Sequence, residues 1–333
     1  MVALETLRGP AGPRPRHVAS GLLATLRHAI AARMKDAIWG AADLVGHGAG
    51  RLPEPLADPL RATVLVAVQA GASALGLWRG PRRWVNELSP TLSPPRAWAL
   101  AAAIERHHYL AKAVLRQSQI AGEGWLVRVV DVRGRATLDA LQAERRPVVV
   151  VAWHAGLVAA LPAALAQCGR TGLFLRLGDP TPPRHGFAMT ATGTAPNLRA
   201  RSLIQAVSAL KKGETVVVVT GIGTRDTPHV MAQLLGRAVC VAPGAAVMAR
   251  LAGAAIVPVE CRFRRGRITI EVFDPLPRGV DDEETTRRLA AFFAARLVAD
   301  PSALWRNELG RLVEAALIAP DTVGPDPVGS GRR

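Results

Sequence analysis

The rhythm of the sequence changes at Gly124, and this change restricts the fold more than any other feature. Beyond it, short runs of β-branched residues alternate with stretches of helical periodicity. The runs at residues 148–152 and 216–219 are wholly apolar, as a strand must be when both faces of its sheet are covered. Strands that alternate with helices predict an α/β fold, with a layered and mostly parallel central sheet flanked by helices.

The pattern places six strands and four helices in this part of the chain. We expect strands over residues 125–132, 148–153, 172–176, 215–220, 255–263 and 268–273, and helices over residues 135–144, 157–167, 200–211 and 244–251. A further helix is expected to begin near Asp281. The predicted α/β domain covers residues 121–317.

Residues 17–120 are predicted to form a separate, wholly helical region. Apolar residues recur at helical spacing over 17–45, and a long helical run over 96–119 follows Pro94 and Pro95. Residues 62–78 carry no charge. They are too few for a membrane span, and polar and glycine residues interrupt their apolar run. A core helix or an interfacial helix is the preferred interpretation, with a span left open. We interpret the whole region as a membrane-docking region.

The two ends of the chain are rich in Gly and Pro and show no periodicity. Residues 1–16 are predicted to be a disordered arm, and residues 318–333 a disordered tail. The arm has no apolar core followed by a cleavage site, so it does not have the pattern of a secretory signal.

Charge and cysteine content exclude several classes of protein. The chain has 42 Lys and Arg against 26 Asp and Glu, a formal balance of +16, which suits nucleic acid, an anionic membrane or acidic substrates, or reflects an Arg-rich composition. With one Tyr and six Phe, it offers few rings for stacking on bases, so nucleic acid is not the expected partner. Three cysteines without metal-ligand spacing disfavour a disulfide framework and a zinc site, and no metal is expected.

His154 is the first candidate for catalysis. It directly follows the buried strand over 148–153 and precedes a helix. In open α/β sheets, ligands bind at the carboxyl ends of strands, so a histidine there is well sited for acid–base chemistry. A lone histidine at a strand end is also often only a structural residue.

Several motifs place His154 in a wider context. Trp153-His154-Ala155-Gly156 is followed by a Lys-Lys-Gly turn and a strand, by Gly223-Thr224-Arg225, by Leu-Leu-Gly-Arg ending at Arg237, by Ala-Pro-Gly-Ala over 242–245, and by Leu-Ala-Gly-Ala-Ala-Ile-Val-Pro-Val over 251–259. This order resembles the lysophospholipid acyltransferase superfamily and, within it, the lipid A biosynthesis (late) acyltransferase branch. Pro301 and Trp305 are similar to the Pro-x-x-x-Trp ending of that branch.

The resemblance implies a glycerolipid acyltransferase-like fold. It also implies a transferase that moves a fatty acyl group from acyl-CoA or acyl carrier protein to a hydroxyl of a lipid or glycolipid. No cofactor is expected. His154 would be the general base. Arginine binds phosphate in a bidentate manner, and these substrates carry phosphate. The expected substrate-binding residues are Gly156, Arg199, Arg201, Gly223, Thr224, Arg225 and Arg237.

The chain departs from the family pattern at its acids. The branch has a carboxylate five residues after the histidine, where this chain has Ala159, and residues 155–166 contain no acid. The superfamily's Glu-Gly-Thr-Arg is Ile222-Gly223-Thr224-Arg225 here, and Gly221 stands near an Asp position of the branch. A catalytically degenerate protein that binds lipid or acyl groups is therefore the alternative, unless an acid such as Asp179 or Asp226 approaches from another loop.

The motifs also narrow the meaning of the positive charge. An anionic membrane surface becomes the most economical partner, since each cation near such a surface contributes about 1 kcal/mol. We expect a peripheral or weakly anchored protein on the cytoplasmic face of the inner membrane. The acyl length, the donor, the acceptor and the oligomeric state are left open.

Overall fold

A computed structural model describes most of the chain. The described residues are 15–79, 85, 87, 92–177, 182–192, 195–223, 227–264, 267–304 and 308–312. The predicted arm lies outside them except for its last two residues, which begin the first helix. The predicted tail over residues 318–333 lies outside them entirely.

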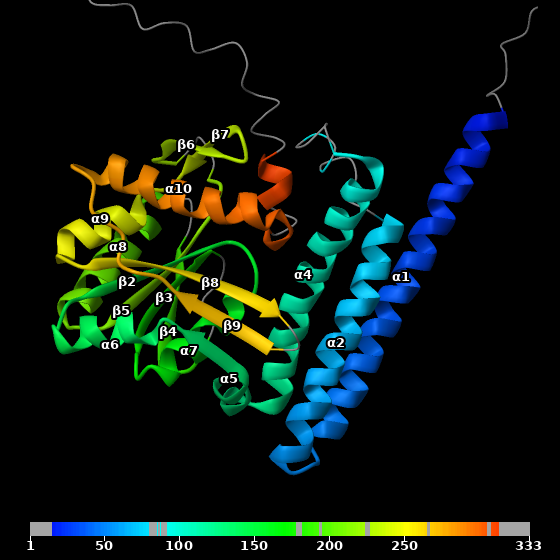
Figure 1. The fold of residues 1–333 in the computed structure, drawn as a ribbon, viewed down its shortest axis with the longest axis horizontal. Helices are drawn as coiled ribbons and strands as arrows, with labels where there is room; N and C mark the ends of the chain where they lie inside the picture. The colour runs from blue at the N-terminus through cyan, green and yellow to red at the C-terminus, as the bar shows by residue number, and fades with distance from the viewer. Residues whose placement is uncertain are drawn as a thin grey trace, which may run out of the picture.

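Three long helices form the N-terminal region. They are α1 (Pro15–Ala49), α2 (Glu54–Arg79) and α4 (Pro94–Ala121), and they lie side by side, with α4 between α2 and the sheet (Figure 1). The helices predicted over 17–45 and 96–119 are confirmed, and residues 62–78 form part of α2. Prolines fit the first turn of α4 because the N–H groups there have no partner within the helix. In the described helices, no stretch is both long and apolar enough to cross a membrane.

A seven-stranded mixed sheet forms the centre of the α/β domain. Its order is β1 (Val130–Arg133), β9 (Arg267–Val272), β8 (Ala255–Arg264), β2 (Val148–Trp153), β5 (Thr215–Thr220), β3 (Gly172–Leu177) and β4 (Phe187–Thr192). The five strands from β8 to β4 run parallel, and β9 runs antiparallel to β8. The predicted α/β class, with a mostly parallel sheet, is confirmed.

Helices cover both faces of this sheet. They are α5 (Glu123–Val129), α6 (Arg135–Ala143), α7 (Leu161–Gln167), α8 (Pro196–Lys211), α9 (Gly244–Ala252) and α10 (Asp282–Ala299), with short 3₁₀ helices η1 (Val158–Ala160) and η2 (Pro301–Ala303). Side chains alternate along β2, so Val148 and Val150 enter one core, whereas Val149 and Val151 enter the other. This two-sided burial explains why β2 is apolar throughout.

One local prediction was wrong, and three strands were missed. The predicted strand over 125–132 is helix α5 followed by the short β1, because Trp125 and Leu126 are buried against the core from a helical turn. Short apolar runs do not distinguish helix from strand by periodicity alone. The hairpin of β6 (Val230–Leu234) and β7 (Arg237–Val241) was missed, although Leu235 and Gly236 both have the positive φ of a two-residue hairpin turn. The edge strand β4 was also missed.

Candidate functional site

His154 lies at the carboxyl edge of the parallel strands. It directly follows β2, and its backbone N–H donates to the Thr220 carbonyl oxygen at 2.7 Å, at the end of the neighbouring β5. The pairing of these two strands therefore fixes where the histidine leaves the sheet. The edge is the one at which ligands bind in open α/β sheets, as the sequence predicted.

A carboxylate lies beside the imidazole, and it comes from far along the chain. The His154 Nδ1 atom is 3.3 Å from Oε1 of Glu308. The imidazole is 32% exposed, whereas the Glu308 side chain is 1% exposed. The pair thus combines an accessible base with a carboxylate shielded from water. Asp179 and Asp226, which we considered from the sequence, lie outside the described residues.

Glu308 is held by donors on both of its oxygens. The backbone N–H of Ile222 donates to Oε2 at 2.7 Å, and Nη1 of Arg311 donates to Oε1 at 3.1 Å. The same Arg311 nitrogen donates to the Ile222 carbonyl oxygen at 3.0 Å. A buried carboxylate is stable only when it is paired and hydrogen-bonded, and these contacts supply both conditions.

Gly221 leaves room for this carboxylate. A Cβ atom placed on Gly221 would lie 2.7 Å from Oε2 of Glu308 and 3.0 Å from its Cδ. Any side chain at this position would therefore collide with the carboxylate in its observed position. Gly221 is also the position near which the family resemblance led us to expect an acid.

The segment before Glu308 is paired with the loop over residues 154–157, which we call the histidine loop. Leu304 forms an antiparallel bridge with Ala155, and the Gly156 N–H donates to the Ala303 carbonyl oxygen at 2.9 Å. Leu304 is buried. The backbone that precedes Glu308 is thus attached to the two residues that follow His154.

Gly156 has a structural reason to be glycine. Its φ is +59°, and a Cβ there would lie 1.9 Å from the Cys261 carbonyl oxygen. That oxygen accepts the Leu157 N–H at 3.1 Å, so the loop rests directly on β8. A contact between Gly156 and substrate stays a prediction.

The other predicted site residues are spread over several elements. Arg199 and Arg201 lie at the start of α8, half-buried and exposed respectively. The Gly223 N–H donates to the Cys240 carbonyl oxygen at 2.8 Å. The Arg237 guanidinium donates to the Glu87 carbonyl oxygen and so binds the backbone of another segment. Thr224 and Arg225 lie outside the described residues.

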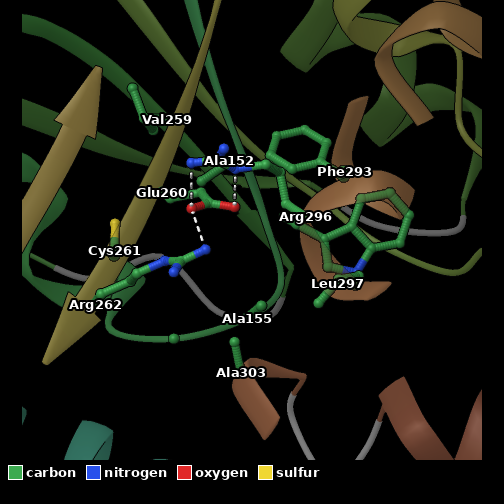
Figure 2. Close-up of a pocket in the computed structure, with 12 residues that line it drawn as sticks. Ala152, Ala155, Val259, Glu260, Cys261, Arg262, Phe293, Arg296, Leu297 and Ala303 are labelled. Carbon is green, nitrogen blue, oxygen red and sulfur yellow. Dashed lines mark hydrogen bonds and ion pairs between the residues drawn. The ribbon is translucent and has the colours of Figure 1, made fainter. Parts of the chain in front are cut away.

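A small cavity lies beside the histidine loop (Figure 2). Its walls include Trp153, Gly156 and Glu260, and its volume of about 30 Å³ is room for one or two water molecules, which is too little for an acyl chain. Glu260 lies between Arg296, at 3.1 Å, and Arg262, at 2.6 Å. This ion cluster joins α10 to β8 and is best explained as structural.

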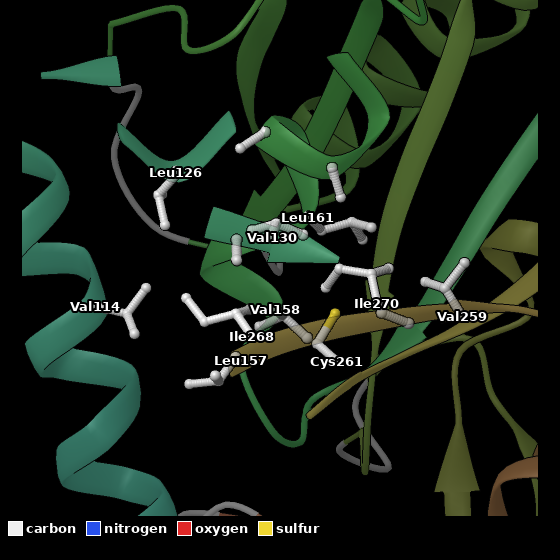
Figure 3. Close-up of a cluster of buried hydrophobic side chains, with 14 of the residues drawn as sticks. Val114, Leu126, Val130, Leu157, Val158, Leu161, Val259, Cys261, Ile268 and Ile270 are labelled. Carbon is white, nitrogen blue, oxygen red and sulfur yellow. The ribbon is translucent and has the colours of Figure 1, made fainter. Parts of the chain in front are cut away.

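The helix that follows the histidine loop is anchored in the core. Figure 3 shows Leu157 and Val158 in one cluster with Cys261 and with Val114 of α4. The N-terminal helices and the histidine loop therefore share one hydrophobic core. Burial raises the pKa of the Cys261 thiol, so this cysteine is unsuited to act as a nucleophile.

Neither a disulfide nor a metal site is formed by the described residues. All three cysteines are buried and free. Over the described ranges, no three His, Cys, Asp or Glu side chains converge as a ligand set.

The fold and the site define an α/β protein with a histidine–carboxylate pair at the carboxyl edge of its parallel strands. The family model described as bacterial lipid A biosynthesis acyltransferase matches residues 116–305, and the chain belongs to this family. A search among curated proteins finds no match. The matched region includes His154 and ends three residues before Glu308.

Sequence reasoning identified His154 but missed Glu308. The two residues are 154 positions apart, so no local spacing relates them. The one cue was the position of Glu308 just after the Pro-x-x-x-Trp ending, with Arg311 three residues on. That cue predicts a helical ion pair and nothing about the histidine.

Proposed function

We propose that this protein is an acyltransferase that moves a fatty acyl group from a carrier thioester to a hydroxyl of a lipid or glycolipid. Membership of the lipid A biosynthesis acyltransferase family supports acyl transfer to a lipid. The observation that carries the proposal is the pairing of His154, at the carboxyl edge, with the buried carboxylate of Glu308. The donor would be acyl-CoA or acyl carrier protein, and no cofactor takes part.

His154 acts as the general base in this proposal. An ionised carboxylate only accepts hydrogen bonds, so Nδ1 of His154 carries the proton that it donates to Glu308, and Nε2 is the basic nitrogen. Nε2 takes the proton of the acceptor hydroxyl while the hydroxyl oxygen attacks the thioester carbonyl carbon. The C–S bond then breaks, and the imidazolium returns the proton to the leaving thiolate. A positioned base contributes about 10²–10⁴ in rate.

The substrates carry phosphate, and arginines are the proposed contacts. Arg199 and Arg201 on α8 and the Gly223-Thr224-Arg225 motif keep the role that the resemblance gives them. Arg237 is a weaker candidate for binding phosphate, because its guanidinium donates to the Glu87 carbonyl oxygen. Bidentate pairing with phosphate would orient the acceptor or the pantetheine arm of the donor.

The N-terminal helices supply the proposed membrane contact. Leu44 of α1 is 76% exposed and Leu56 of α2 is 62% exposed, and Leu26, Ile30 and Val66 add further exposed apolar side chains on the same two helices. Apolar side chains with nearby cations are typical of helices that lie in a bilayer interface. We place the protein peripherally on the cytoplasmic face of the inner membrane.

The rival proposal is a degenerate family member that binds lipid without turnover. It was motivated by the missing acid at Ala159, and the carboxylate of Glu308 beside His154 favours the enzyme instead. A protein that only bound lipid would have no need of a buried carboxylate beside a half-buried imidazole.

The test is transfer of a labelled acyl group from acyl-CoA and from acyl carrier protein to phosphorylated glycolipid acceptors in mixed micelles. We expect turnover by the native chain and a loss of at least about 10²-fold in His154→Ala. His47→Ala is the matched control, because His47 is exposed on α1 and hydrogen-bonds within its own helix. Saturable lipid binding without turnover of any donor would favour the degenerate protein, and unchanged activity of His154→Ala would exclude His154 as the base.

A further inference from the structure

We infer that Glu308 is the positioning residue of His154, and that it replaces the acids which the family pattern places at Ala159 and near Gly221. This inference rests on the proposed function, since it assigns a role in the same reaction. It also places part of the catalytic machinery beyond the region that the family model matches, which ends at residue 305.

The first argument is space at the end of β5. Gly221 has no side chain and stands near the place where the branch often has an Asp. The Glu308 carboxylate occupies the position that a side chain at residue 221 would need, with Oε2 2.7 Å from the Cβ that Gly221 lacks. An acid at residue 221 and the observed Glu308 are therefore mutually exclusive. Gly221 instead leaves the space in which the carboxylate of Glu308 reaches His154.

The second argument is orientation. Ile222 N–H holds Oε2 at 2.7 Å and Arg311 holds Oε1 at 3.1 Å, so the carboxylate is fixed with Oε1 toward Nδ1 of His154. A carboxylate held in this way selects one histidine tautomer and stabilises the imidazolium that forms during catalysis. Arg311 also donates to the Ile222 carbonyl oxygen, which ties the helical residues 308–312 to the end of β5.

The third argument is the shared frame of the two partners. Residues 303 and 304 pair with residues 155 and 156, which directly follow His154. Glu308 comes four residues after this attachment and is anchored again at Ile222. The two attachments, at residues 155–156 and at Ile222, hold the segment that carries Glu308 to the backbone next to His154, as a positioned pair of side chains requires.

A purely structural explanation of Glu308 makes different predictions. Glu308 and Arg311 form an i,i+3 ion pair, and such pairs occur in many helices without catalytic meaning. If this pair were the whole role, loss of the carboxylate would lower stability but would not change the imidazole or the chemical step in protein that remains folded.

The experiment compares Glu308→Gln with Glu271→Gln. Gln keeps the size of Glu and an oxygen for the Ile222 N–H but removes the charge. Glu271 is also paired with an arginine, at 3.3 Å from Arg296, on strand β9. We expect Glu308→Gln to lower kcat by about 10²–10⁴ with little change in KM, because the imidazole loses the carboxylate that orients it. Glu271→Gln should retain native kcat.

A second measurement needs no activity. Nitrogen-15 NMR of the histidine side chains in the native protein should show His154 protonated at Nδ1, with its signals assigned by their absence in His154→Ala. A native imidazole protonated at Nε2 would overturn the inference even if Glu308→Gln failed to fold.

The outcomes separate the inference from the proposed function. An active native protein with an inactive His154→Ala and a fully active Glu308→Gln would overturn the role of Glu308 and leave the function standing. A native protein that transfers no acyl group but has the Nδ1–H tautomer would refute the function and leave the pairing intact.

Discussion

Substituting Gly221 by Ala tests the arrangement of the site with a single methyl group. The new Cβ would lie 2.7 Å from Oε2 of Glu308, 3.0 Å from its Cδ and 3.2 Å from Oε1, all closer than ordinary contact. Because Glu308 is buried and held by Ile222 and Arg311, the carboxylate can relieve the overlap only by moving about 0.5–1 Å away from these donors. A catalytic group displaced by about 1 Å costs about 10² in rate.

We therefore expect Gly221→Ala to lower the single-turnover rate of acyl transfer about 10²-fold and the free energy of unfolding by about 1–3 kcal/mol. The matched control is Gly310→Ala, two residues after Glu308, where a Cβ meets nothing within 4 Å. This control should keep native activity, and its free energy of unfolding should rise by about 0.4–1 kcal/mol. Single-turnover transfer and chemical denaturation measure the two quantities. Native activity in Gly221→Ala, or an equal loss in Gly310→Ala, would refute the reasoning.

Three other predictions follow from particular residues. Ala159→Glu, which restores the family's acid, should bring no gain in kcat, because His154 already has a carboxylate partner; a clear gain in the transfer assay would count against Glu308. Leu56→Glu should weaken binding to anionic vesicles in a sedimentation assay. The control Val280→Glu, at a 95% exposed position of the α/β domain, should leave vesicle binding unchanged. Equal binding by both variants would argue against the proposed membrane contact. Burial, together with Arg106, lowers the pKa of His107 below 6.5, so the unfolded chain binds more protons and stability falls as the pH is lowered through this range. His107→Gln should lose less stability than the native protein between pH 7.5 and 5.5 in thermal unfolding, and an equal loss would contradict this assignment.

The sequence predicted the centre of the fold better than its periphery. β2 and β5 were located to the residue, because a strand buried on both faces is a continuous apolar run that polar and turn residues interrupt sharply. The helix α5 was taken for a strand because seven residues are too few to show a period. The strands β6 and β7 are short and half-exposed, and their existence depends on pairing with each other.

The candidate site divides in the same way. His154 was predicted as a candidate because the signal is local, a histidine directly after a buried strand. Glu308 was missed because its contact with His154 exists only in three dimensions, where the bridge between Ala155 and Leu304 brings the two segments together. Gly221 looked like a lost acid in the sequence, and the structure gives it a reason: it leaves space for a carboxylate from another element.

The central claim is that His154 and Glu308 act as one catalytic unit, and a double-mutant cycle on the single-turnover rate tests it most directly. Groups that act as a unit are strongly non-additive. The account predicts that His154→Ala combined with Glu308→Gln is no slower than His154→Ala alone, because a carboxylate with no imidazole to position contributes nothing. Independent losses that multiply in the double variant would contradict it.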